Sequence, residues 1–288
     1  MSSMTMPRAV AVYLASAFMC LSVILRAGLV MAGPMQAELE APPSASIEQA
    51  RELFENGDFE RAAAVARQCD APGADALAAR ATLSQGDFYG TLVTRRQIFL
   101  EAEADARRAI ARDPQDPEGH LYLALALGFL GRVDGSLVAH FAGYADEARK
   151  EIDEALKLDP QSAWAHALDG GLIGEQMYGA SPEKGIAAFR EALALQPGNA
   201  AIAYQFALQL LALGGATYRA EALRVLVRSL EPEEGNAVQR LARQRVRRLK
   251  LALDTHDDMA MKFILREALG TYSDAQTKKP GLLPGGRK

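Results

Sequence analysis

Four prolines, each closing an amphipathic segment, divide the sequence into units of similar length. Pro114, Pro160, Pro197 and Pro232 follow one another at intervals of 46, 37 and 35 residues. After Pro160 and Pro197, a short polar turn leads directly into a second amphipathic segment. A period of this length is typical of stacked helical hairpins, because one hairpin alone cannot bury its apolar face. The spacing therefore predicts an array of helix pairs.

Small side chains recur at fixed places in each unit. In the helix before each proline they are Ala102 and Ala109, Ala148 and Ala155, Gly185 and Ala192, and Ala220 with the departure Val227. In the helix after each proline they are Ala124, Gly170, Ala207 and Ala242. Small residues on one helix face let the neighbouring helix approach closely. We therefore expect these positions to lie at helix–helix contacts.

The pattern resembles the tetratricopeptide repeat superfamily, in proteins of the exported bacterial type. The resemblance spans residues 47–270 and is strongest in 115–232. Several units exceed the usual length of about 34 residues, which predicts insertions near 86–96 and 129–143. The resemblance implies an all-α fold, a right-handed superhelical array of antiparallel helix pairs, that binds another protein or peptide. It does not identify the partner.

Composition and periodicity also favour helices throughout. Alanine and leucine dominate, and no stretch alternates polar and apolar residues with the period of a strand. The helices expected from the periodicity cover 47–56, 60–69, 74–85, 97–112, 117–130, 144–158, 163–175, 182–195, 200–213, 218–230, 235–253 and 257–270.

The N-terminus carries the features of an export signal. Residues 9–25 form an apolar run after Arg8, and Val30-Met31-Ala32 offers the small residues that a leader peptidase recognises. We expect a signal peptide over 1–32 and a periplasmic protein. The alternative is anchoring to the inner membrane by residues 9–25, and membrane contact is expected only if this segment is retained. Residues 33–46 are interpreted as a flexible linker and 271–288 as a disordered tail.

Charge and motifs narrow the classes of function. The whole chain has a net charge of −4, and removal of 1–32 takes away two arginines and no acid, which leaves −6. This balance argues against nucleic acid as a partner. The sequence contains no motif for a nucleophile, a phosphate loop or a metal site, so we expect neither an enzyme nor a cofactor.

The inner helices of such an array carry the candidate binding residues. The predicted concave surface includes Leu121, Leu125, Trp164, Gly171, Tyr204 and Leu208. An apolar surface with a glycine floor suits a peptide, a helix face or a lipid-like ligand. A second possibility is that the array's own terminal helix fills the groove.

Two polar residues interrupt the apolar pattern in the middle of the array. Asp169 stands where Leu123 and Phe206 stand in the adjacent units, so the repeat phase predicts a buried carboxylate. Burial of a carboxylate requires a partner, and His166 lies three residues earlier on the same face. We expect a structural His166–Asp169 pair, or a hydrogen bond from the Tyr178 turn or a helix N-terminus.

A basic helix face and turn aromatics complete the candidates. Arg240, Arg243, Arg247 and Lys250 recur at helical intervals, as a solvated face or a site for an acidic partner or lipid headgroup. Phe88, Phe141 and other aromatics lie in the hairpin turns, where they either seal the helix pairs or form a pocket.

Together these features favour a non-enzymatic protein-binding scaffold of the cell envelope. The alternative is a periplasmic accessory protein of a transporter that binds a small apolar or amphipathic ligand.

Overall fold

Helices account for every regular element in the described residues, which are 45–174, 182–231 and 235–269 of the computed structural model. These residues belong to one compact unit, residues 44–288. The predicted signal peptide 1–32, all but the last two linker residues and the tail 271–288 lie outside them, as does Tyr178.

The described residues contain thirteen helices, whose order follows the chain. They are α1 (Ile47–Asn56), α2 (Phe59–Gln68), α3 (Ala74–Tyr89), α4 (Arg95–Arg112), α5 (Pro117–Asp134), α6 (Ser136–Phe141), α7 (Tyr144–Leu158), α8 (Ala163–Gly174), α9 (Pro182–Leu195), α10 (Ala200–Leu213), α11 (Ala216–Arg228), α12 (Ala237–Asp254) and α13 (Asp258–Leu269).

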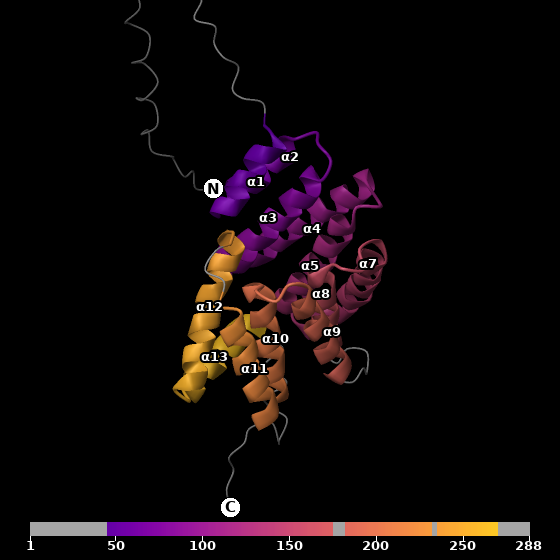
Figure 1. The fold of residues 1–288 in the computed structure, drawn as a ribbon. Coiled ribbons are helices and arrows are strands. Elements are labelled where there is room, and N and C mark those ends of the chain that lie inside the picture. Colours follow the sequence, from indigo (N-terminus) through magenta and orange to yellow (C-terminus); the bar gives the residue numbers. More distant parts are fainter. Residues whose placement is uncertain (1–44, 175–181, 232–234, 270–288) are drawn as a thin grey trace, which may run out of the picture. The chain divides into compact units, whose positions relative to one another are not determined.

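Neighbours in sequence are neighbours in space. The strongest packing joins α3 with α4, α5 with α7 and α8 with α9, and each pair packs on the next. Figure 1 shows this succession from the indigo α1 to the yellow α13. The prediction of an all-α array of antiparallel helix pairs is confirmed. The predicted insertions are short: α3 continues to Tyr89 before the turn at 90–94, and the second insertion forms the six-residue α6.

Local sequence explains where the helices begin and end. Side chains of Ser46, Asp58, Asp116, Asn199 and Asn236 accept hydrogen bonds from the first amides of their helices. Such caps satisfy amide groups that have no partner inside the helix. The turn between α1 and α2 uses Gly57 at a φ of 96°, a conformation that glycine adopts without steric cost.

The predicted small residues lie at the helix contacts in most units. Ala109, Ala155, Ala192 and Ala207 are all buried. Gly170 shows why size matters, because a Cβ there would lie 2.7 Å from Phe189 Cδ2 and 2.8 Å from the Gly185 carbonyl oxygen. Glycine at this position therefore permits the close crossing of α8 and α9.

The last repeat before α12 departs from the predicted phase. Ala220 and Val227 are exposed, whereas Ala222 and Ser229 are buried and have the same spacing of seven residues. The predicted small positions were therefore wrong by two residues in α11. Alignment on Pro232 caused the error, because Pro232 follows the buried Ser229 by three residues, whereas the other repeat prolines follow their buried small residue by five.

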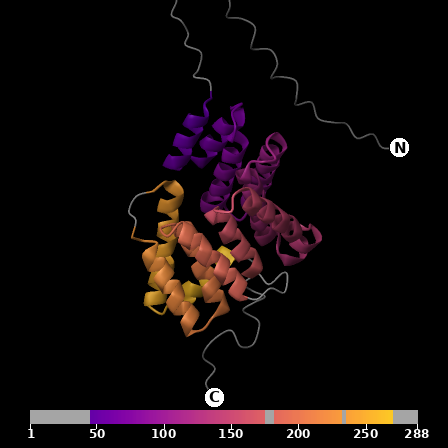
Figure 2. The ribbon, with the colours of Figure 1, turned by 45° about the vertical axis from the view of Figure 1, so that its right-hand side comes forward.

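The terminal helix α12 also returns to the start of the array. Ala237, Val238 and Leu241 of α12 pack into the apolar cluster of the first helices, beside Phe54 and Phe59. Contacts join α12 with α1 as well as with α10 (Figure 1, and from a second direction Figure 2). No helix within the described part of the chain is long and apolar enough to cross a membrane.

Candidate partner-binding surface

The six residues predicted to line the concave surface separate into two groups. Leu208 is fully buried, and Leu121 and Tyr204 are each 7% exposed. Leu125, Trp164 and Gly171 are half-buried. Leu208, Leu121 and Tyr204 therefore offer little surface to a partner, whereas Leu125, Trp164 and Gly171 keep part of theirs.

Over α10 the inner face is covered by the chain's own last helices. Leu208 and Tyr204 belong to the same buried cluster as Val246 and Leu249 of α12 and Ile264 of α13. Burial raises the pKa of Tyr204 from 10.0 to about 12, an effect that the nearby Arg245 partly opposes. The alternative of a groove filled by the terminal helix thus holds for this section.

Over α5 and α8 the inner face keeps free space. A Cβ added at Gly128 would meet no atom within 4 Å, and one at Gly171 would meet only Phe189 Cζ, at 4.0 Å. Leu125 and Trp164 remain half-buried beside them. We call Leu125, Gly128, Trp164 and Gly171 the open inner patch. The patch is apolar, and its two glycines have no side chains that would project from it.

Side chains of α12 bond to the first helices of the array. Arg245 donates to the Asp87 carboxylate at 2.7 Å and to the Asp87 carbonyl oxygen at 2.6 Å. Its guanidinium also lies 4.3 Å from the ring centroid of Phe88. Arg240 donates to the carbonyl oxygen of Glu55 at 3.2 Å. These bonds fasten the last repeat to α1 and α3.

The prediction of a continuous solvated basic face on α12 was therefore wrong in part. Arg243 is only 3% exposed, and Arg240 is occupied by backbone carbonyl groups. Lys250 pairs with Asp254 at 2.5 Å. The residue that makes the main connection, Arg245, lies between the predicted positions. Helical periodicity shows that arginines share a face but does not show that another helix covers it.

His166 and Asp169 do not form the predicted pair with each other. The His166 ring donates from Nε2 to the Pro160 carbonyl oxygen at 3.0 Å, while Asp169 accepts from Arg149 of α7. The Asp169 side chain is 21% exposed. The carboxylate thus obtains a partner from the preceding repeat, which a pattern within one helix does not reveal.

The buried histidine–carboxylate pair forms one repeat earlier. His120 Nδ1 lies 2.6 Å from Glu151 Oε2, and His120 Nε2 lies 3.1 Å from the Pro114 carbonyl oxygen. Because the carbonyl can only accept, Nε2 carries a proton, and the contact at Nδ1 needs a second one. The pair therefore joins α5 to α7 in the interior. His120 and His166 both stand six residues after a repeat proline. This shared spacing is the feature of the sequence that could have indicated a paired histidine at His120.

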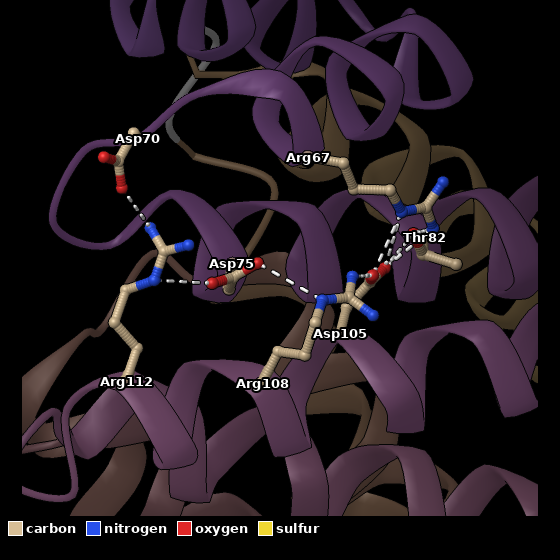
Figure 3. Close-up of polar contacts among 7 residues, drawn as sticks. All are labelled: Arg67, Asp70, Asp75, Thr82, Asp105, Arg108 and Arg112. Atoms are coloured by element: carbon tan, nitrogen blue, oxygen red, sulfur yellow. Dashed lines mark hydrogen bonds and ion pairs between the residues drawn. The ribbon is translucent and has the colours of Figure 1, made fainter.

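A polar cluster between α2, α3 and α4 was not anticipated. Asp105, 1% exposed, accepts from Arg67 at 2.7 Å and from Thr82 at 3.1 Å, and also pairs with Arg108. Arg108 and Arg112 in turn reach Asp75, as Figure 3 shows. The buried carboxylates are matched by guanidinium groups, so the cluster joins three helices. We interpret it as structural.

Metal binding and cysteine chemistry depend on how the side chains of the described residues are grouped and buried. They contain no group of three or more metal-ligating side chains. Cys69 is buried, its thiol contacts the Val65 carbonyl oxygen at 3.2 Å, and burial raises its pKa. A raised pKa disfavours the reactive thiolate.

Comparisons with known proteins bear on the fold. No family model and no curated protein matched the sequence significantly. Among solved structures, a thermophilic TPR protein from Thermus thermophilus superimposes with a TM-score of 0.52 at 21% sequence identity. The match covers 69% of this chain and 96% of that protein. The described helices of this chain therefore have the fold of the tetratricopeptide repeat proteins.

Proposed function

We propose that this protein is a non-enzymatic interaction scaffold that binds an apolar segment of another protein on the open inner patch. The observation that carries the proposal is the free space in front of Gly128 and Gly171, next to the half-buried Trp164. Tryptophan is enriched among the residues that contribute most of the binding energy at protein interfaces. The fold supports binding in general, and the patch supplies a place for it.

The chemistry of the patch indicates what kind of segment it takes. Leu125 and Trp164 present apolar surface, and the two glycines allow a partner's side chains to approach the helix backbone. A helix or extended segment with small or medium apolar side chains fits such a surface. None of the four residues of the patch carries a charge, so their side chains offer apolar contacts only.

We further propose that the protein acts in the cell envelope. This part of the proposal rests on the apolar run 9–25 and the small residues before Gly33. Sequencing the N-terminus of protein purified from its own host is the direct check. An N-terminus at Gly33 supports export, whereas Met1 in a soluble cytoplasmic fraction contradicts it.

Trp164 allows the binding proposal to be tested directly, because it is the chain's only tryptophan. Random peptides displayed on phage are selected against the full chain, and the enriched peptides are titrated while Trp164 fluorescence is recorded. We expect the emission to shift to the blue on binding. In Gly128→Leu, the new side chain occupies the free space, and we expect affinity to fall at least about tenfold, the loss of about 1.4 kcal/mol.

Ala104→Leu is the matched control, because Ala104 is an exposed position of α4 far from the patch in sequence. It should leave peptide affinity unchanged. Peptides that bind without a spectral change, and equally well to the Gly128→Leu variant, would place the site elsewhere. If only small apolar compounds shift the Trp164 emission, the patch serves a small ligand, as a transporter accessory protein would require.

A further inference from the structure

Exposed apolar side chains gather at two neighbouring hairpin turns. In the turn between α3 and α4, Leu92 is 91% exposed and Val93 is 88% exposed. On α6, Leu137, Val138 and Phe141 are 70%, 50% and 81% exposed. We call these five residues the apolar turn edge. Isolated exposed apolar residues are ordinary, but five of them on two insertions require an explanation.

Polar contacts hold the two turns together. Arg96, at the start of α4, donates to the Asp134 carboxylate at 2.7 Å, and Asp134 ends α5 just before α6. The Tyr144 hydroxyl, at the start of α7, donates to the same carboxylate at 3.2 Å. The Asp134 side chain is only 7% exposed, so it joins α4, α5 and α7 from within. The bonds therefore hold the residues that flank the two turns, at the start of α4 and the end of α5, next to each other.

The geometry of α6 aims apolar side chains outward. Leu137, Val138 and Phe141 occupy positions that lie on one side of a helical turn, whereas Ala139 is 2% exposed and packs inward. A single turn of helix with such a face contributes little to the core. Its exposed side instead presents apolar surface away from the core.

The charge around the edge differs in sign from that of the whole chain. Residues 90–97 and 131–143 contain three arginines and one carboxylate, although the chain carries a net charge of −4. Asp134 is already paired with Arg96, which leaves the positive charges of Arg95 and Arg132. The Arg132 guanidinium lies over the Phe129 ring at 5.3 Å, and Arg95 Nε is buried without a hydrogen-bond partner, so both arginine side chains are half-buried at the base of the edge.

We propose that the apolar turn edge inserts into the interface of a membrane with anionic headgroups. Leu92, Val93 and Phe141 would enter the acyl boundary, and Arg95 and Arg132 would lie at the level of the lipid phosphates. Side chains that project almost freely from turns suit a bilayer, which requires no complementary shape. The nearby arginines supply the attraction that single apolar tips lack.

This contact uses none of the residues of the open inner patch and does not require residues 9–25. The test uses residues 44–288, a compact unit that contains all the described helices and excludes the apolar run. Circular dichroism verifies that this fragment is folded, and binding by residues 9–25 then cannot be mistaken for binding by the edge. The fragment's only cysteine, Cys69, is buried. A cysteine introduced at an exposed position can therefore be labelled selectively.

The test labels Val93→Cys and Phe141→Cys with a polarity-sensitive fluorophore and adds vesicles of phosphatidylglycerol and phosphatidylcholine. We expect a blue shift at both positions. Leu251→Cys is the matched control, because Leu251 is 63% exposed but lies on α12. It should show no shift. A shift at all three positions, or at none, would overturn the proposal.

Flotation with unlabelled protein provides the second measurement. Val93→Glu combined with Phe141→Glu should lower the bound fraction on anionic vesicles more than about tenfold, and circular dichroism verifies that the variant is folded. Arg132→Gln should lower binding about fivefold, the value of one basic residue near an anionic surface. Equal binding to pure phosphatidylcholine would refute the anionic assignment. Unchanged flotation of the double variant would show that the edge serves another partner, such as a protein.

Discussion

Two stretches of the inner face occupy equivalent places in the repeat but have different surroundings. Leu208 on α10 and Leu125 on α5 each follow the small residue of their helix, Ala207 and Ala124. Leu208 is fully buried under α12 and α13, whereas Leu125 is half-buried. The comparison teaches that a repeat position does not by itself define a binding surface. Whichever inner residues the terminal helices leave uncovered remain available to a partner.

The largest expected effect separates these two leucines. Leu208→Ala should lower the free energy of unfolding by about 2–5 kcal/mol, because it opens a cavity in a fully packed site. Leu125→Ala should cost clearly less, about 1 kcal/mol, since part of that side chain already contacts solvent. Chemical denaturation measures both. Equal losses would mean that the α5 face is as closed as the α10 face.

The covered stretch should also respond to high pH. The pKa of Tyr204 is about 12 in the folded chain, above the 10.0 of an unburied tyrosine. The unfolded chain then releases this proton first, so stability falls as the pH rises from about 10 to about 12, by up to about 3 kcal/mol. Below a pH of about 10 the contribution is fully present.

Tyr204→Phe should remove part of this decline, and denaturation curves recorded below and above the pKa of an ordinary tyrosine provide the check. Burial also raises the pKa of Tyr122, so some decline will remain in the variant. If the variant and the parent lose stability in parallel, Tyr204 is not held beneath α12 and α13.

A smaller effect is expected where α12 meets the first repeats. Arg245→Ala removes the bonds to Asp87 and the contact with Phe88, and should cost about 1 kcal/mol, because both charged side chains are a quarter exposed. The rate of backbone amide hydrogen exchange should increase in the first turns of α12 and stay unchanged in α8. Exchange that remains slow along α12 would show that the other contacts hold it, namely the Arg240 bond to the Glu55 carbonyl oxygen and the apolar contacts of Ala237 and Leu241.

The smallest effect has the opposite sign. Gly128→Ala should raise stability by roughly 0.5 kcal/mol, because alanine favours a helix and the added methyl group meets no atom. Gly170→Ala is its counterpart, since the same methyl group would collide with Phe189 and the Gly185 backbone. Thermal melts of the two variants should move in opposite directions. Destabilisation by Gly128→Ala would mean that the open inner patch is already filled.

Sequence reasoning described the helices well and the inner surface incompletely. Most helix boundaries agree with the prediction to within a few residues, because capping residues and prolines act locally. The two-residue error in α11 arose where the loop length changed. His166 and Asp169 were paired by proximity along one helix, whereas Asp169 bonds Arg149 and the buried pair joins His120 to Glu151. Long side chains reach partners on neighbouring helices that sequence spacing does not identify.

The sequence by itself determined that this chain forms a stack of helix pairs. Its period, small residues and turn prolines act within a hairpin or between adjacent hairpins, so they can be found along the chain. Only the tertiary structure decided which inner residues stay open, because that depends on α12 returning to α1 and α3. Arg245 and Asp87 are 158 residues apart, and no local pattern encodes their contact. Distant contacts of this kind form only when the stacking angles of all intervening repeats bring the two ends together.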